Sequence, residues 1–307
     1  MRIKVIINAG GGSVRGEDIT QQLTEAFAKH GVEASVAEVE GAALPETVKA
    51  ALQEPWDGIV VGGGDGTIGT AAGLVAGTDR AFGVLPLGTR NHFAKDLGLP
   101  LEVEEAIAVI AAGHLRPIDV VRINDRVFIN NATVGLYADI VRGREYEQEQ
   151  HGLPKNPATV LATLRALWHF TRHRLIVRAE GWGERLRTPL VFIGNNLYST
   201  SLPNPGRRCA LDKGELCLCI ARHPSRLAIV RMFLRALAGR LREDRDFEMR
   251  AIPEVEIRSH RPQLNVTLDG EVLKMRPPLQ CRSWPGALRV FAPVEQGAPP
   301  PEPSPGE

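Results

Sequence analysis

The sequence contains a glycine-rich run with the composition of a phosphate-binding loop, Gly62-Gly63-Gly64-Asp65-Gly66-Thr67. Apolar residues precede it and a helical pattern follows it. Glycine lets backbone N–H groups approach a ligand closely, and N–H groups that converge at a helix start attract phosphate. The spacing fits neither the GxGxxG pattern nor the GxxxxGK[ST] pattern. The run therefore predicts a phosphate cradle of another type; the competing interpretation is a tight strand-to-helix turn capped by Asp65.

Two further segments could contribute to the same site. The first, Pro86-Leu87-Gly88-Thr89, follows an apolar stretch and leads into a polar loop that contains Asn91. Strand ends of a parallel sheet meet at one edge, so this loop should lie beside the glycine-rich run. The second, Leu268-Asp269-Gly270-Glu271, presents two carboxylates in a tight turn. Taken alone, that turn is typical of an ordinary hairpin.

Together these segments resemble the diacylglycerol kinase catalytic family, which includes sphingosine kinases and bacterial YegS-like lipid kinases. The resemblance rests on Gly63–Thr67, on Pro86-Leu87-Gly88-Thr89-x-Asn91-x-Phe93-Ala94 and on the Leu-Asp-Gly-Glu turn, in the family's order. It extends to about residue 294. The Gly-Gly-Asp-Gly-Thr element alone also occurs in NAD kinases, whereas the other two elements favour lipid kinases.

The resemblance implies an α/β fold in which an N-terminal three-layer α/β nucleotide-binding domain precedes a C-terminal antiparallel β-sandwich domain with an apolar lipid cleft. It also implies the cofactors ATP and Mg²⁺ and an active site between the domains. The residues that would hold ATP are Asn8, Gly63, Gly64, Asp65, Gly66, Thr67, Gly88, Thr89 and Asn91. The residues that would organise Mg²⁺ are Asp65, Asp119 and Asp269.

The same resemblance makes Asp269 and Glu271 the catalytic residues, with Glu271 as the base. A lipid hydroxyl is a weak nucleophile, so it needs a positioned carboxylate to accept its proton. The transferred phosphoryl group needs N–H groups and a metal ion to stabilise its negative charge. The function expected is ATP-dependent transfer of the γ-phosphoryl group to a lipid hydroxyl, such as that of diacylglycerol.

Several positions differ from the family pattern. Gly69 and Thr70 stand where Asn-Glu is common, and His92 stands where Asp is common. Lys213 occupies a loop that binds a second metal in some bacterial members, and its cation argues against a metal there. Gly69, Thr70 and His92 keep open the alternative of a non-catalytic lipid- or nucleotide-binding protein, and the shared Gly-Gly-Asp-Gly-Thr element keeps open that of a soluble NAD kinase-like enzyme.

The hydrophobic pattern predicts two kinds of organisation. Strands are expected over 3–8, 32–39, 58–61 and 81–85, alternating with helices over 17–30, 45–53, 71–76 and 103–112. This alternation is typical of a parallel sheet with helices on both faces. After about residue 115, strands joined by hairpins or loops predict an antiparallel sandwich or barrel; they are expected over 116–124, 127–132, 175–179, 189–195, 215–221, 254–259, 264–268 and 288–292.

We therefore expect a nucleotide-binding domain over 1–121 and a β-sandwich lipid-binding domain over 122–294. Two helices should interrupt the second domain, near 157–173 and 225–243; the first could cover a lipid entrance or belong to the core, and the core is the preferred interpretation. The second places arginines beside an apolar face, as in helices that lie on anionic membranes; taken alone, it is more typical of an ordinary packed helix with solvated arginines. The Pro-rich acidic segment 295–307 is expected to be disordered.

Charge is distributed unevenly along the 307 residues, although the formal net charge is only +1. Residues 1–121 hold 9 Lys/Arg and 16 Asp/Glu, whereas residues 122–294 hold 28 and 17. The basic half indicates an anionic partner, although ordinary surface scatter in an Arg-rich composition is the alternative. Beside a lipid substrate, the expected partner is an anionic membrane surface, not nucleic acid. With no apolar run of about 18 residues and no signal peptide, we expect a cytoplasmic protein at the inner membrane face. A homodimer is compatible with the sequence.

Overall fold

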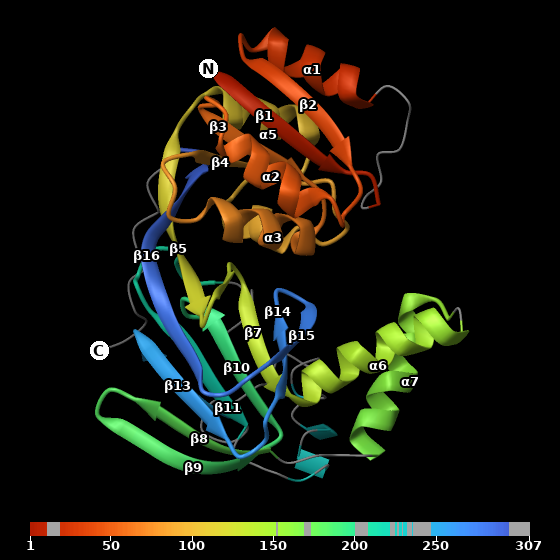
Figure 1. The fold of residues 1–307 in the computed structure, drawn as a ribbon, viewed down its shortest axis with the longest axis vertical. Coiled ribbons are helices and arrows are strands. Elements are labelled where there is room, and N and C mark those ends of the chain that lie inside the picture. The colour runs from red at the N-terminus through yellow and green to blue at the C-terminus, as the bar shows by residue number, and fades with distance from the viewer. Residues whose placement is uncertain are drawn as a thin grey trace, which may run out of the picture.

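The structure is a computed structural model that describes residues 1–10, 19–151, 153–168, 173–199, 208–221, 225, 227–228, 230–231, 235 and 247–294. The chain forms an α/β part that contains the N-terminus and a mainly β part from which two helices project (Figure 1). The segment 295–307 and most of the helix expected at 225–243 lie outside the described residues.

The α/β part is built on four parallel strands in the order β2-β1-β3-β4. They are β1 (Arg2–Asn8), β2 (Glu33–Val39), β3 (Gly58–Gly62) and β4 (Ala81–Leu85). The five residues of β3 and of β4 are all buried, because helices cover both faces of the sheet. The sequence predicted each of these strands within one residue at either end.

Two pairs of helices form the outer layers of this part: α1 (Ile19–Lys29) with α5 (Val103–Ala111), and α2 (Leu44–Leu52) with α3 (Asp65–Val75). Val5 and Ile7 of β1 pack in one core with α1 and α5, while Ile6 packs in another core with α2 and α3. Alternate side chains of a strand point to opposite faces, so the two cores lie on opposite sides of one sheet. The predicted three-layer arrangement is confirmed.

One long strand, β16 (Leu279–Phe291), joins the two parts of the molecule. Its end pairs in parallel with β4, and its beginning pairs in antiparallel with β13 (Glu254–Ser259). It also runs antiparallel to β5 (Leu115–Ile123), with a register shift between Trp284 and Leu288. The sheet continues through β8 (His173–Ala179) to β9 (Trp182–Thr188), and β6 (Arg126–Phe128) pairs with β5.

A second, six-stranded sheet is antiparallel throughout. Its order is β12 (Phe247–Ile252), β11 (Leu216–Ala221), β10 (Leu190–Asn195), β7 (Asn131–Gly135), β14 (Leu264–Leu268) and β15 (Glu271–Met275). One of its faces packs on the first sheet, with Val134, Ile193 and Val266 meeting Val177 and Ile257. The C-terminal β-sandwich expected from the sequence is therefore confirmed.

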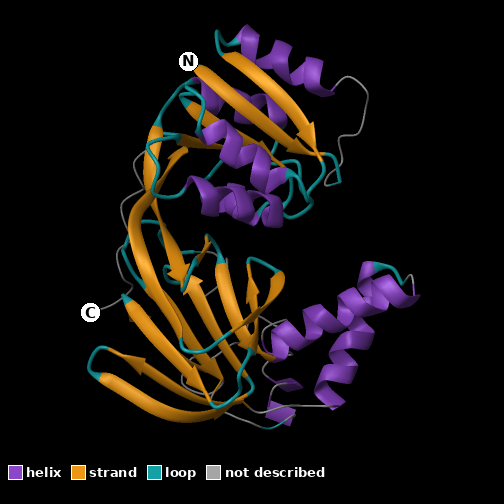
Figure 2. Cartoon of the chain, in the orientation of Figure 1, coloured by secondary structure: helices purple, strands orange, loops and turns teal. Residues whose placement is uncertain are grey.

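Two helices, α6 (Leu136–His151) and α7 (Lys155–Trp168), project from the sandwich as a hairpin (Figure 2). Ala158 and Ala162 are the buried residues of α7, whereas Val160, Leu164 and Trp168 are 60%, 61% and 75% exposed. The interpretation of this helix as core was wrong for Leu161, Leu164 and Trp168, which are exposed, whereas Leu167 packs in a small apolar cluster. In the described part of the chain, no helix combines the length and apolarity needed to cross a bilayer.

Candidate active site

The two glycine loops meet at the carboxyl ends of β3 and β4. A Cβ atom on Gly88 would lie 2.5 Å from the Cα of Gly64 and 3.2 Å from the carbonyl oxygen of Gly63. Real Cβ atoms do not approach so closely, so only glycine permits this contact. The prediction that the two loops lie side by side is confirmed.

Asn91 holds the second loop in shape. Asn91 caps the start of the short helix α4 (His92–Asp96), a segment that was expected to be a loop. Its backbone φ of 50° lies in the left-handed region. Its side-chain oxygen accepts from the backbone N–H of Gly88 (3.0 Å), and its amide donates to the carbonyls of Pro86 (3.0 Å) and Gly88 (2.8 Å). Asn91 therefore shapes the loop through its own contacts, while Thr89 is exposed beside it.

Asp65 and Thr67 stand in the first turn of α3, next to both loops. The Asp65 carboxylate accepts from the backbone N–H of Phe93 (3.3 Å), which ties α3 to α4. The Asn8 amide donates to the Thr67 hydroxyl (2.9 Å), and the Asn8 oxygen accepts from the N–H of Gly10 (3.0 Å). The structure thus brings Asn8, Gly63–Thr67 and Gly88–Asn91 together around the start of one helix.

The carboxylate turn of the second sheet lies against the same helix. A Cβ on Gly69 would lie 2.8 Å from Oδ2 of Asp269, and a Cβ on Gly66 would lie 3.8 Å from Oε1 of Glu271. Residues 269 and 271 are about 200 positions from α3 in sequence, and strand pairing of β14 with β15 and β7 presents them there. Gly69, which departs from the family pattern, leaves the space that the Asp269 carboxylate occupies.

The Asp269 carboxylate is held by three backbone N–H groups. Its Oδ1 accepts from Asn130 (2.8 Å) and Asn131 (3.0 Å), and its Oδ2 accepts from Ile129 (2.9 Å). Burial of the carboxyl group raises the pKa of Asp269 to about 6, against the lowering effect of these hydrogen bonds and of Arg208. Asp269 therefore fixes the link between β6 and β7, and its left-handed φ of 46° sets the turn that presents Glu271.

Glu271 is the carboxylate of the turn that faces outward. It lies at the exposed start of β15, yet partial desolvation raises its pKa, with Arg126 lowering it and Glu145 raising it further. A deprotonated carboxylate with a raised pKa is a stronger base, which favours acceptance of a proton from a substrate hydroxyl. Among the predicted site residues, Glu271 has the position and the electrostatics for proton transfer.

Asp119 lies at the junction of the two parts and is 2% exposed. Its carboxylate accepts from the N–H groups of Gly214 (2.6 Å) and Gly286 (2.9 Å) and from the amide of Asn196 (3.2 Å). Within the described ranges, no three His, Cys, Asp or Glu side chains gather closely enough to hold a metal ion. The structure thus does not bring Asp65, Asp119 and Asp269 into one metal cluster.

Sequence reasoning missed a buried arginine that links the two parts. The Arg208 guanidinium donates to Asp96 of α4 (2.7 Å), to the carbonyl of Ile129 (2.6 Å) and to the side chain of Asn130 (3.2 Å). Its side chain is fully buried. Arg208 and Asp96 are 112 residues apart, and no local pattern signals such a pair. The nearest signal was the arginine content of the basic half.

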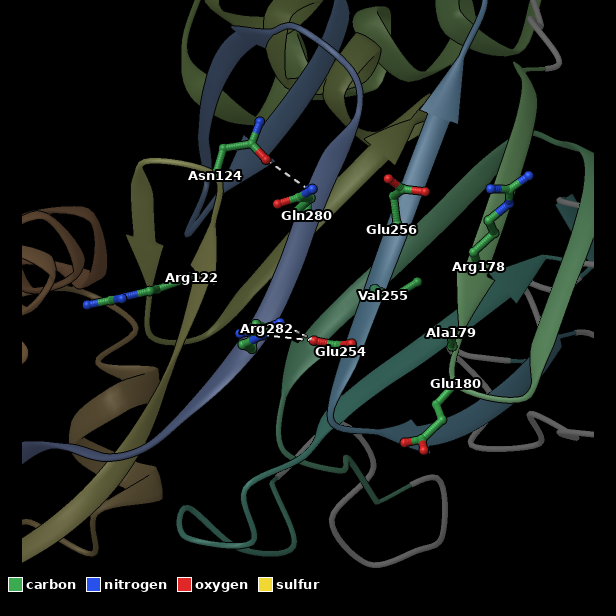
Figure 3. A pocket seen from close by; sticks show the side chains of 10 residues that line it. All are labelled: Arg122, Asn124, Arg178, Ala179, Glu180, Glu254, Val255, Glu256, Gln280 and Arg282. Atoms are coloured by element: carbon green, nitrogen blue, oxygen red, sulfur yellow. Dashed lines mark hydrogen bonds and ion pairs between the residues drawn. The ribbon is translucent and has the colours of Figure 1, made fainter.

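A charged groove of about 870 Å³ lies away from this site, on the outer face of the larger sheet. Figure 3 shows that Arg122 of β5, Arg178 of β8 and Arg282 of β16 line it, together with Glu254 and Glu256 of β13. Arg282 donates to Glu254 (2.8 Å). Its three arginines are matched by Glu180, Glu254 and Glu256, so the groove has no net charge, and none of the predicted catalytic residues line it.

Comparisons with known proteins agree with this geometry. The diacylglycerol kinase catalytic domain matches residues 2–123, and the YegS C-terminal NAD kinase beta sandwich-like domain matches residues 139–292. Proteins named "Probable lipid kinase YegS-like" from Chromohalobacter salexigens and Pseudomonas putida are 31% and 30% identical, over 76% and 80% of this chain and 76% and 81% of their own.

The fold has counterparts among solved structures. The crystal structure of a diacylglycerol kinase from Bacillus anthracis strain Sterne aligns with a TM-score of 0.65 at 19% identity, covering 95% of this chain and 97% of that one. At this identity the likeness concerns the fold alone. The two domain matches and the similarity to full-length relatives show the family: this chain belongs to the YegS-like branch of the diacylglycerol kinase family.

Proposed function

We propose that the protein is an ATP-dependent lipid kinase that transfers the γ-phosphoryl group to a lipid hydroxyl, such as that of diacylglycerol. One observation carries the proposal: the turn with Glu271 lies against the first turn of α3, where the glycine loops and Asp65 converge. A base and a phosphate cradle thus face one another across the two domains.

The site fits ATP. The first N–H groups of a helix have no partner within that helix, so the start of α3 offers donors to phosphate oxygens. Gly63, Gly64 and Gly88 keep the approach free of side chains, and the Asn8–Thr67 hydrogen bond borders it. We assign Asn8, Gly63–Thr67 and Gly88–Asn91 to ATP binding.

The site also fits Mg²⁺ in the form that kinases use. Mg²⁺ is commonly held by one or two carboxylates together with water and substrate phosphates, without an all-protein cage. Asp65, at the start of α3, is the carboxylate placed for this role. When bound, Mg²⁺ would neutralise negative charge on the phosphates. The carboxylates of Asp119 and Asp269 already accept hydrogen bonds from backbone N–H groups. We therefore assign these two residues positioning roles near the metal site.

The reaction follows from the placement of these groups. Glu271 accepts the proton of the lipid hydroxyl while the oxygen of that hydroxyl forms a bond to the γ-phosphorus of ATP. The bond between that phosphorus and the β,γ-bridging oxygen breaks, and ADP leaves. Backbone N–H groups at the start of α3 stabilise the charge that develops on the phosphoryl oxygens.

Two surfaces support contact with an anionic membrane at the inner face of the cell envelope. The outward side of α7 exposes Val160, Leu164 and Trp168. The β8–β9 ribbon exposes Arg174 directly opposite Arg187. Like charges that face each other across strands destabilise a sheet, so an anionic partner would relieve their repulsion. We propose that the protein binds such a membrane peripherally.

The decisive experiment supplies the purified protein with labelled ATP, Mg²⁺ and a total lipid extract. A labelled lipid is expected, and Asp65→Asn and Glu271→Gln should each abolish its formation. Labelled NADP from added NAD would favour the NAD kinase-like alternative. Binding of ATP and lipid without any labelled product would contradict the kinase assignment.

A further inference from the structure

Strand β11 carries two cysteines on one face of the six-stranded sheet. Leu216, Leu218 and Ile220 pack in the sandwich core, and successive side chains of a strand point to opposite faces, so Cys217 and Cys219 lie on the other face. Two residues of a strand span about 6.6 Å, yet the two Sγ atoms are only 3.5 Å apart. The two side chains therefore turn toward one another.

A third sulfur atom stands on the neighbouring strand. Met249 of β12 pairs directly with Cys219, and directly opposed residues have Cβ atoms about 4.5–5.5 Å apart. The unbranched side chain of methionine is flexible, so its sulfur can reach the two thiols. Cys219 and Met249 are partly exposed, whereas Cys217 is buried. This sulfur cluster, which consists of Cys217, Cys219 and Met249, thus has one side open to small solutes.

The surroundings of the sulfur cluster are apolar. The residues paired with the two cysteines on the same face are Phe192, Gly194 and Ala251, together with Met249. A Cβ on Gly194 would lie 2.4 Å from Cε2 of Tyr198, so the tyrosine ring packs over this glycine. Among the described residues, no third Cys, His, Asp or Glu joins the two cysteines in a possible metal site. Any ligand of the cluster would therefore be held by sulfur.

Two reactions are open to such a pair of thiols: oxidation to a disulfide and binding of a metal ion. Disulfides usually join Cα atoms no more than about 6.8 Å apart, so a bond between cysteines two positions apart in an extended strand lies at the limit of relaxed geometry. A bond from sulfur to a metal such as zinc is about 2.3 Å long, which places two sulfurs on one ion about 3.8–4.0 Å apart. The observed 3.5 Å needs only a small widening, so the spacing favours a metal.

The number and type of ligands distinguish between metals. Structural zinc takes four protein ligands, as a rule, and the sulfur cluster supplies three. Thiolate and thioether sulfurs are soft ligands that select Cu(I), an ion that is stable with two or three of them. An apolar setting also suits Cu(I), because it keeps water and oxidants away from the metal.

We propose that Cys217, Cys219 and Met249 bind one Cu(I) ion through two thiolates and one thioether. Each thiol releases its proton to water as its sulfur bonds to the metal, and no electron is transferred. Because β12 is the edge strand of its sheet, the bound ion would fasten this edge to β11. The proposal goes beyond the lipid kinase function and does not depend on it.

The test titrates the reduced, metal-free protein with Cu(I) under anaerobic conditions, in competition with a chromogenic Cu(I) chelator. Cys209 is exposed and could bind the metal alone, so every protein tested carries Cys209→Ser. Burial raises the pKa of Cys281 to about 12, so this thiol stays protonated and does not compete. We expect one Cu(I) per chain, and X-ray absorption should show sulfur ligands only, at about 2.3 Å.

Two sets of variants locate the metal. Cys217→Ser with Cys219→Ser should abolish binding, whereas Met249→Leu should weaken it about tenfold or more. Met275→Leu is the matched control, because Met275 lies on β15 at the opposite edge of the same sheet and should leave the affinity unchanged. Leucine replaces methionine with little change of volume, so this comparison decides the matter even if the double serine variant does not fold.

Stability gives a second measurement. A ligand that binds only the folded state stabilises it, so Cu(I) should raise the urea midpoint of the protein with all three sulfurs and not that of the double serine variant. Equal Cu(I) binding with and without the two cysteines, or nitrogen and oxygen ligands in the absorption spectrum, would overturn the proposal. So would an absence of Cu(I) binding, which would leave the cysteines as small apolar side chains.

Discussion

At the scale of single residues, the two carboxylates of the final turn do different work. Asp269 is enclosed by three backbone N–H groups and fixes the link between β6 and β7. Glu271 lies two residues on, faces the start of α3 and has a raised pKa through desolvation. The Leu-Asp-Gly-Glu motif alone cannot distinguish the role of Asp269 from that of Glu271. The three N–H donors that hold Asp269 lie 138 to 140 residues from it in the sequence.

The raised pKa of Glu271 predicts the acid limb of the activity profile. A base must be deprotonated, so kcat/KM for the lipid should fall as pH drops through that pKa, at a higher pH than for an ordinary glutamate. Glu271→Gln should reduce kcat by about 10²-fold or more and remove the limb. Because Glu271 is exposed, the substitution should change the free energy of unfolding of the protein by less than about 0.5 kcal/mol. An unchanged pH profile in the variant would contradict its role as base.

At the scale of elements, α3 serves both domains at once. Its first turn faces the glycine loops, and its second turn receives Asp269 at Gly69. The next glycine of the helix, Gly73, has more room, since a Cβ there would lie 3.5 Å from Val127. The two glycines therefore form a natural comparison within one helix.

Alanine at these two positions should have opposite effects. Gly69→Ala would place a methyl group 2.8 Å from Asp269 Oδ2, so the turn with Glu271 should shift and kcat should fall at least about tenfold. Overpacking of this kind costs about 1–3 kcal/mol. Gly73→Ala should leave kcat unchanged and stabilise the helix by up to about 1 kcal/mol. Steady-state kinetics and urea unfolding of both variants test this, and equal activity would refute the close contact.

The sequence predicted the α/β elements well because their buried strands and amphipathic helices have strong periodicity. It missed α6, β9, β12 and β15, predicted α3 only over 71–76 and β16 only over 288–292, and read the separate strands β6 and β7 as one strand over 127–132. That strand breaks at Ile129 and Asn130, whose N–H groups turn to Asp269. The loops of the phosphate cradle were predicted from local composition, whereas the contacts of Arg208 and Asp269 join segments that are distant in the sequence.

At the scale of the whole molecule, Arg208 links the two domains through hydrogen bonds. It joins Asp96 of α4 to the Ile129–Asn130 link that Asp269 also holds. The catalytic turn and the loop after β4 are thus connected through one buried guanidinium. The boundary between residues 121 and 122 stays a prediction.

Removal of that guanidinium should destabilise the protein strongly. Arg208→Ala leaves Asp96 without its buried partner, which costs about 3 kcal/mol or more. Lys49→Ala is the control, because its ion pair with Glu46 is exposed and should contribute less than about 1 kcal/mol. Chemical unfolding measures both. Equal losses of unfolding free energy in the two variants would contradict the role of Arg208 in linking the domains.

Membrane binding should divide into two components. Replacement of Arg174, Arg185 and Arg187 by Gln should weaken binding to vesicles rich in anionic lipid at low salt and have less effect at high salt, because salt screens exposed charges. Leu164→Ser with Trp168→Ser should weaken binding equally at both salt concentrations. Vesicle sedimentation measures each. If membrane binding by the wild-type protein depends on neither salt nor anionic lipid, Arg174, Arg185 and Arg187 do not contribute to it.

The path of β16 has a consequence for how the protein is made. This strand supplies the neighbour of β4 in the N-terminal sheet, yet it follows β4 by about 200 residues in the sequence and is synthesised later. Until it is synthesised, β4 has a free edge, and free edges favour association with other chains. A fragment that stops before residue 279 should therefore aggregate during expression, and the nucleotide-binding half cannot complete its sheet ahead of the rest of the chain.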